Sequence, residues 1–187
     1  MECALCQNKI CLKGIECDKF YGINSKKENI EHYLKSDSDS RILNTSSKIS
    51  KNISRLEEVS SYIDFMGIKV VGIGFCKGLQ KEGEILHNYL TNKGVECHSV
   101  ICGHASIDNE DLNLKKKNKD AFEVSCNPYG QATIMNNLKT ELNIALGFCI
   151  GHDILFSKYS EVPVTTLVVK DRVNKHCPTK GFEVIKK

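Results

Sequence analysis

The stretch LNIALGFCIGHDILFSKYSEVPVTTLVVKDR, residues 142–172, decides the fold class of this chain. It contains two apolar runs of strand length, at 144–148 and 164–169, with a short helical segment at 154–159 between them. The first run ends in Cys-Ile-Gly-His-Asp and the second in Lys-Asp-Arg. Open α/β sheets carry their chemistry at the carboxyl ends of their strands, so this stretch predicts an α/β sheet with a functional edge.

The same alternation of strand and helix continues towards the N-terminus. A capping box at Ser54 begins a helix, and strands at 68–75 and 95–102 enclose a helix at 80–92. A β-α-β order with short connections requires a parallel pair and a right-handed crossover. A further helix, between the strands at 95–102 and 144–148, is expected from Pro128 to about Thr140. The sequence therefore predicts a small, Rossmann-like, four-stranded parallel sheet in the order 2-1-3-4, with helices on both faces.

Length and composition limit the number of domains. With 187 residues, 41% of them hydrophobic, the chain is long enough for one sound core and a small appendage. We expect a cysteine-rich metal-binding knuckle at 1–25, a linker with a helix at 26–53, and the α/β domain at 54–187. Within the linker, the run SDSDS at 36–40 is expected to interrupt the helical structure.

Charge and hydropathy argue against nucleic-acid and membrane partners. The net charge is only +3, and the one basic run, at 115–119, lies in a polar connection where a solvated loop is expected. No apolar segment approaches about 20 residues, and the first nine residues are polar and do not resemble a signal peptide. We therefore expect a cytoplasmic protein whose oligomeric state the sequence leaves open.

Ten cysteines in such a chain favour metal, cluster or thiol chemistry, because a reducing cytosol disfavours a framework of disulfides. Four of them open the chain, and the first two form a CxxC turn. Four thiolates can close a tetrahedral zinc site or hold an iron–sulfur cluster. Both a structural zinc knuckle and a redox cluster remain open for this set, which consists of Cys3, Cys6, Cys11 and Cys17.

A second group of cysteines follows the predicted strands. Cys76 and Cys149 end strands, and Cys126 precedes a helix, where the helix dipole is expected to lower its pKa. Because the carboxyl ends of parallel strands share one edge, these three thiols are candidates to hold an iron–sulfur cluster, which would be a second one if the N-terminal set also holds a cluster, or to carry sulfur as a persulfide. Cys102 is the weaker member of the group, since its strand could end beside the edge. In an enzyme, Cys126 and Cys149 would be catalytic, and His152 would assist proton transfer.

These motifs resemble an uncharacterised family of predicted metal-binding proteins, found chiefly in anaerobic bacteria and archaea. The resemblance is carried by SRLEEVSSYIDFMGIKVVGIGFCKGL, by CNPYGQATIMNN and by the opening stretch with its CxGHD segment and KDRV ending. It implies metal binding, and no activity is attached to it. Cys17 is followed by Asp18 where a Pro is expected in many members, which weakens an iron–sulfur assignment there, and Cys177 is an additional thiol. The resemblance carries over to the N-terminal ligand set Cys3, Cys6, Cys11 and Cys17, and to the edge residues Cys76, Cys126, Cys149, His152 and Asp153.

Two classes of function are compatible with these residues. The first is a redox or sulfur-handling enzyme that uses the edge cysteines on a small or sulfur-containing ligand. The second is a non-catalytic module that binds a metal or a small anion and carries a structural zinc knuckle. The enzyme requires at least three edge thiols close to one point, whereas the binding module does not.

Overall fold

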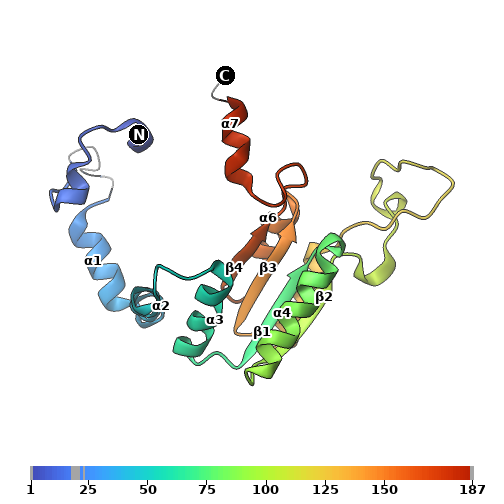
Figure 1. Cartoon of the computed structure of the whole chain (residues 1–187), viewed down its shortest axis with the longest axis horizontal. Helices are drawn as coiled ribbons and strands as arrows, with labels where there is room; N and C mark the ends of the chain where they lie inside the picture. The colour runs from blue at the N-terminus through green and yellow to red at the C-terminus, as the bar shows by residue number, and fades with distance from the viewer. Residues whose placement is uncertain (1, 18–21, 23, 186–187) are drawn as a thin grey trace. The chain divides into compact units, whose positions relative to one another are not determined.

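A computed structural model describes residues 2–17, 22 and 24–185 (Figure 1). The sequence prediction of a parallel α/β sheet is confirmed, and so is its strand order, β2-β1-β3-β4. All neighbouring strands are parallel. The strands are β1 (Val70–Phe75), β2 (Glu96–Ile101), β3 (Leu142–Phe148) and β4 (Val164–Val169).

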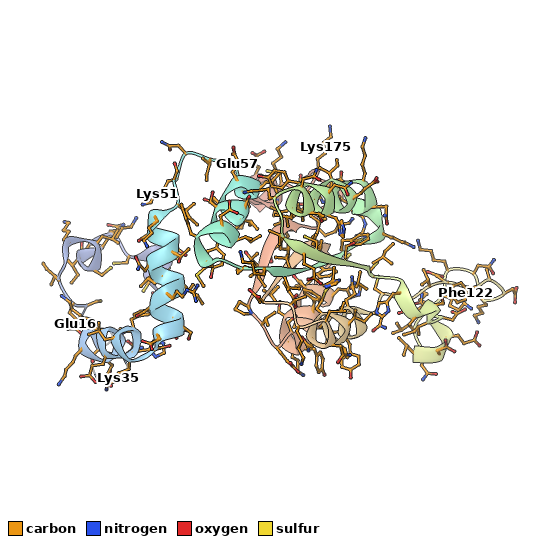
Figure 2. The ribbon with its side chains drawn as sticks, turned by 90° about the horizontal axis from the view of Figure 1, so that it is seen from below. Glu16, Lys35, Lys51, Glu57, Phe122 and Lys175 are labelled. Atoms are coloured by element: carbon orange, nitrogen blue, oxygen red, sulfur yellow. The ribbon has the colours of Figure 1, made fainter. Side chains whose placement is uncertain are left out.

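Helices cover both faces of the sheet, as predicted, and Figure 2 shows α4 and α5 on opposite sides of it. One face packs Ile63 of α3 and Leu86 of α4 against Val71 and Ile144. The opposite face packs residues of α5 and α6 against the sheet, among them Phe156, which has no exposed surface. The four helices are α3 (Arg55–Met66), α4 (Gln80–Asn92), α5 (Pro128–Asn137) and α6 (His152–Tyr159).

Strand β3 contains a bulge that matters for the functional edge. Alternate residues of a strand face opposite sides, yet Phe148 packs in the same cluster as Ala145. The register with β4 shifts on both sides of Leu146, and Gly147 has a φ of +69°. The bulge therefore turns the end of β3 over, immediately before Cys149.

Residues 103–125 leave the sheet after β2 and return at α5 (Figure 1), and their only regular elements are two 3-10 helices, His104–Ser106 and Glu110–Leu112. A single bridge pairs Asp108 with Val124. The Nζ atom of Lys116 lies 3.0 Å from a carboxylate oxygen of Asp108, and the two side chains are only 9% and 17% exposed. Phe122 lies far out on this excursion (Figure 2) and is 63% exposed.

The chain divides into two compact units, residues 1–49 and 50–187. The first unit holds two short 3-10 turns, Cys3–Leu5 and Ile10–Lys13, followed by α1 (Lys26–Lys35) and α2 (Asp37–Lys48). Parts of the predicted knuckle, residues 1, 18–21 and 23, lie outside the described residues, as do 186 and 187 at the end of the predicted α/β domain.

The predicted interruption at 36–40 is wrong for four of its five residues. Only Ser36 separates the two helices of the first unit, and its hydroxyl accepts a hydrogen bond from the backbone N–H of Asp39. Asp37 and Asp39 then occupy the first turn of α2, where the helix dipole favours negative charge. The run is therefore a helix start.

The C-terminal segment of the second unit follows β4 with a turn and two short helical pieces. These are the 3-10 helix Pro178–Gly181 and α7 (Phe182–Ile185). Across the whole described part of the chain, no helix combines the length and apolar character needed to cross a membrane. All ten cysteines lie within the described residues, and none of them forms a disulfide.

Candidate functional site

The register of the sheet places Cys76 beside Cys102. Phe75 pairs with Ile101, so the next residue of each strand lies at the same edge. The backbone N–H of Cys102 donates to the carbonyl of Phe75 at 2.9 Å, and that of Cys76 donates to the carbonyl of Leu146 at 3.1 Å. Both side chains are buried, with 8% and 3% of their surfaces exposed. These two thiols therefore stand on backbone that is fixed by the sheet.

The N-terminus of α5 brings a third thiol to the same place. The backbone N–H of Asn127, the N-cap of α5, donates to the carbonyl of Cys102 at 2.7 Å. The preceding residue, Cys126, is half-buried. The thiol of Cys102 has both Cys126 and Cys76 as side-chain hydrogen-bond partners. Three sulfur atoms thus form a connected group with Cys102 in the middle.

This group favours a thiolate at Cys102. The hydrogen bond from Cys126 is the main cause that lowers the pKa of Cys102, to about 5, against the opposing effect of burial. Further support comes from the backbone N–H of Lys77, 3.3 Å from the sulfur, from Cys76 and from the positive charge of Lys77. Donation to Cys102 raises the pKa of Cys126 above its ordinary value, and burial and the charges of the neighbouring thiols act in the same direction.

The expectation that the helix dipole lowers the pKa of Cys126 is therefore wrong. The thiolate of Cys102 lies next to this sulfur, and a second negative charge beside it is unfavourable. The adjacent charge outweighs the dipole at the end of α5. In the metal-free protein, Cys126 is the hydrogen-bond donor and Cys102 the acceptor.

The fourth thiol of the edge, Cys149, is held differently. It follows β3, and the register pairs the preceding Phe148 with Val169 of β4. Its sulfur accepts a hydrogen bond from Nη2 of Arg172 at 3.2 Å. This hydrogen bond is the largest of the causes that raise the pKa of Arg172, and electrostatic interactions with Cys76 and Cys126 act in the same direction. Cys149 therefore lies within electrostatic range of the connected group, through Arg172.

The loop after β4 is built to present Arg172. The carboxylate of Asp171 accepts hydrogen bonds from the backbone N–H groups of Val173 and Asn174, at 3.1 and 2.9 Å. The backbone N–H of Asp171 in turn donates to Nδ1 of His176 at 3.1 Å. Asp171 is thus occupied inside the loop, and the guanidinium of Arg172 is left to the sulfur of Cys149.

A third cation, Lys170, flanks the connected group. A Cβ atom placed on Gly78 would lie 3.0 Å from Nζ of Lys170 and 4.0 Å from the sulfur of Cys76. Ammonium and thiol therefore border the same small space. Lys77, Lys170 and Arg172 thus lie beside Cys102, Cys76 and Cys149 in turn, and nearby positive charge stabilises thiolates.

His152 lies at the edge of the sheet, directly after the Cys149 loop. It is the first residue of α6, and its backbone N–H donates to the carbonyl of Cys149 at 3.0 Å. Within the described residues, its ring has no hydrogen bond or ion pair. In residues 2–17, 22 and 24–185, no three Cys, His, Asp or Glu side chains form a group that could hold a metal ion. The edge thiols are close together but would have to converge further around a metal.

The N-terminal cysteines belong to the other unit and lie on its short turns. Cys3 and Cys11 are exposed, and Cys6 and Cys17 are half-buried. The backbone N–H of Cys6 donates to the carbonyl of Cys3 at 3.2 Å, which closes the CxxC turn. The finding on metal-holding groups covers these residues too, so their assignment as a ligand set stays a prediction.

Cys102 is central to the edge group, although the sequence predicted it to be the weaker member, and the roles of Arg172 and Gln131 were not predicted. The predicted strand order already placed β2 beside β1, so the adjacency of Cys102 and Cys76 could have been inferred. Nε2 of Gln131, which has no exposed surface, donates to the carbonyls of Phe75 and Val100 at 3.3 and 2.6 Å. It ties α5 to the ends of β1 and β2, and no signal in the sequence marks it.

Comparison with known proteins gives a family and one relative. Residues 18–167, which include all four edge cysteines and none of the four N-terminal ones, match the family described as "Protein of unknown function (DUF1847)". An uncharacterised protein of Methanocaldococcus jannaschii is 42% identical over 180 residues, which cover 94% of this chain and 90% of that protein. No solved structure matches the chain significantly. With a match over most of its length, the chain belongs to the DUF1847 family.

Proposed function

We propose that the four cysteines at the carboxyl edge of the sheet bind a soft metal, as zinc or as an iron–sulfur cluster. The observation that carries this proposal is the placement of Cys76 and Cys102 by the register of β1 and β2, with Cys126 joined to them through the hydrogen bond from Asn127 to Cys102 and Cys149 at the end of β3. Thiolate sulfur is the ligand that selects zinc and iron–sulfur clusters over harder ions. The four residues come from four different segments of the chain, so their meeting at one edge is a property of the fold.

The charges around the thiols support a bound metal. Zinc with four thiolates carries a net charge of about −2, as does a cubane cluster with four cysteine ligands. Burying such a charge requires nearby cations. Lys77, Lys170 and Arg172 supply them at this edge, as the contacts with Cys102, Cys76 and Cys149 indicate. A pocket of neutral, inert thiols would have no need of three cations.

A redox or sulfur-handling reaction at this metal is the finer part of the proposal. It is supported by the position of the site at the carboxyl edge of a parallel sheet, with Cys149 only half-buried. In this assignment the N-terminal cysteines form a separate, structural site, preferably for zinc. The alternative is a binding module without turnover, which would keep the same ligands.

The test is to measure iron, zinc and acid-labile sulfide in the full chain purified without oxygen, together with its absorption spectrum. Three variants are compared with the wild type: Cys102→Ser at the edge, Cys3→Ser with Cys6→Ser at the N-terminus, and Cys97→Ser as a control. Cys97 packs against the core, where burial raises its pKa. We expect the edge variant to lose a metal that the control keeps.

The proposal is overturned if every bound metal is lost in the N-terminal variant and none in Cys102→Ser. A second measurement protects against a variant that does not fold. The metal-loaded wild type is treated with iodoacetamide and the modified cysteines are identified by mass spectrometry. We expect protection of the edge cysteines, which chelation should abolish. Equal modification with and without metal would also refute the site.

A further inference from the structure

The four edge thiols are attached to the protein in two different ways. Cys76 and Cys102 stand on backbone that is hydrogen-bonded to the neighbouring strand, and Cys126 is joined to them through the N-cap of α5. Cys149 lies in the connection between β3 and α6, which turns at Gly151 with a φ of +87°. Its sulfur accepts a hydrogen bond from Arg172, and its charge acts on Cys126. Cys76, Cys102 and Cys126 therefore form an inner group, and Cys149 is the thiol that Arg172 holds.

Exposure distinguishes Cys76 and Cys102, which are buried, from Cys126 and Cys149, which are both half-buried. The residues next to the contact between Cys149 and Arg172 are among the most exposed of the described hydrophobic residues. Ile150, which follows Cys149, is 85% exposed, and Val173, which follows Arg172, is 89% exposed. The contact between Cys149 and Arg172 therefore lies between residues that face solvent.

The guanidinium competes with a metal for the sulfur of Cys149. A thiolate that donates its electron pairs to a metal is a weaker acceptor for Arg172, so the hydrogen bond of 3.2 Å competes with coordination of the metal. Arginine carries five N–H donors in a planar fork, so the same side chain can receive another anion in place of Cys149. Lys170, on the side of Cys76, adds a second positive charge.

We propose, on the basis of the metal site argued above, that Cys76, Cys102 and Cys126 are permanent ligands and that Cys149 is an exchangeable one. The position that it vacates takes an anionic sulfur ligand, hydrosulfide or a small thiolate, whose charge is received by Arg172. A soft metal held by three thiolates prefers a fourth sulfur ligand to phosphate or carboxylate. The surrounding cations select the anionic form of that ligand over a neutral one.

Cobalt(II) provides the test, since the intensity of its sulfur-to-metal charge transfer reports the number of bound thiolates. The metal-free full chain carries Cys3→Ser and Cys6→Ser, which remove the predicted N-terminal site, and this reference protein is titrated with cobalt alone, unchanged or with Cys149→Ser or Cys102→Ser added. We expect Cys149→Ser to bind cobalt with charge-transfer intensity lower by about a quarter, since one of four thiolates is lost. Addition of sodium sulfide or 2-mercaptoethanol should restore the intensity in Cys149→Ser and not in Cys102→Ser.

Arg172→Met tests the second half of the inference, with Lys175→Met as the control that removes one charge from the same loop. We expect Arg172→Met to bind cobalt and to need about tenfold more sulfide for the same spectral change in the Cys149→Ser background, the range typical of a lost outer partner. The control should need no more sulfide than Cys149→Ser alone. If Arg172→Met and the control respond equally, the assignment of Arg172 is wrong.

The outcomes separate the inference from the function on which it rests. A reference protein, without the N-terminal site, that binds no cobalt through thiolates refutes the edge metal site itself. A reference protein that binds cobalt, with Cys149→Ser as impaired as Cys102→Ser or unresponsive to sulfide, refutes only the exchangeable ligand. If Cys102→Ser does not fold, iodoacetamide labelling of the cobalt-loaded wild type decides instead. Cys149 should then react before Cys76, Cys102 and Cys126, and simultaneous reaction would contradict the inference.

Discussion

Replacement of Gly147 by alanine tests whether the bulge of β3 is the feature that positions the edge site. Gly147 has a φ of +69°, a conformation that costs a residue with a Cβ atom roughly 1–2 kcal/mol. The added Cβ would overlap Cδ1 of Leu79 and lie 3.1 Å from its Cγ. Leu79 is 4% exposed and packs with Phe75 and Leu146, so it has little room to move.

The two effects set the expected magnitude. Overpacking of a buried site costs about 1–3 kcal/mol, which together with the backbone term gives a loss of about 2–5 kcal/mol in the free energy of unfolding. A β-bulge next to a functional site directs the side chains that follow it. We therefore also expect weaker metal binding by Gly147→Ala, since Cys149 lies two residues further along the chain.

Urea unfolding of the metal-free protein measures the first effect, and a double-mutant cycle with Leu79→Ala separates its parts. Truncation of Leu79 alone should cost about 2–5 kcal/mol. In the double variant the overlap disappears and the backbone strain remains. Its loss in the free energy of unfolding should therefore be smaller than the sum of the two single losses by about 1–3 kcal/mol.

Gly83→Ala is the matched control for the same chemical change. Gly83 lies inside α4, and an added Cβ would be 3.3 Å from the ring of Phe75, a tight contact that the ring relieves by moving a few tenths of an ångström. Alanine is favoured over glycine in a helix by about 1 kcal/mol, which opposes the cost of this contact, so the variant should be close to the wild type in stability. A Gly147→Ala protein as stable as Gly83→Ala, or strictly additive losses in the cycle, would refute the reasoning.

Two further predictions concern charge. The pKa of Cys102 is lowered to about 5 in the folded protein, so between pH 5 and 8 the unfolded chain binds more protons at this residue than the folded chain does. The free energy of unfolding of the metal-free protein should therefore rise with pH across that interval. Cys126→Ala removes the main cause of the shift and should flatten the rise in urea unfolding; equal slopes in both proteins would contradict it. Lys116→Met leaves Asp108 without its buried partner, so the 103–125 excursion should open more easily. Chymotrypsin should then cleave at Phe122 faster in Lys116→Met than in the control Lys115→Met. Lys115 is exposed and forms no ion pair with any described residue. Equal cleavage would show that this ion pair does not hold the excursion.

The arrangement of the sheet could be predicted because its signals are local and agree with one another. The capping box of Ser54 and Glu57 begins α3, as the SxxE pattern indicates. The predicted bounds of α4 and β4 coincide with those of the structure. The prediction that the SDSDS run interrupts the helical structure was wrong, because serine and aspartate favour both a loop and the first turn of a helix. The residues C-terminal to the run decide which of the two forms.

The detail of the edge could not be predicted, because it depends on register and on single side-chain contacts. Cys102 becomes central only when its strand end is aligned with that of β1, and Gln131 matters only when α5 lies across those ends. The bulge at Gly147 changes the face on which Phe148 and the following residue lie, and a periodicity of two cannot reveal it. The contact of Arg172 joins residues 23 positions apart, through a loop whose geometry Asp171 fixes.

Metal binding by the two sets of cysteines depends on folding to different extents. This difference decides which bound metal would stabilise the α/β unit. Cys3, Cys6, Cys11 and Cys17 lie within one short segment, so a metal could bind them without the sheet. The edge thiols are separated by most of the second unit and meet only when β1, β2, β3 and α5 are in place. Any ligand that binds only the folded state stabilises that state by mass action. A metal at the edge must therefore raise the stability of residues 50–187, whereas a metal at the N-terminal cysteines gives the sheet no such direct stabilisation.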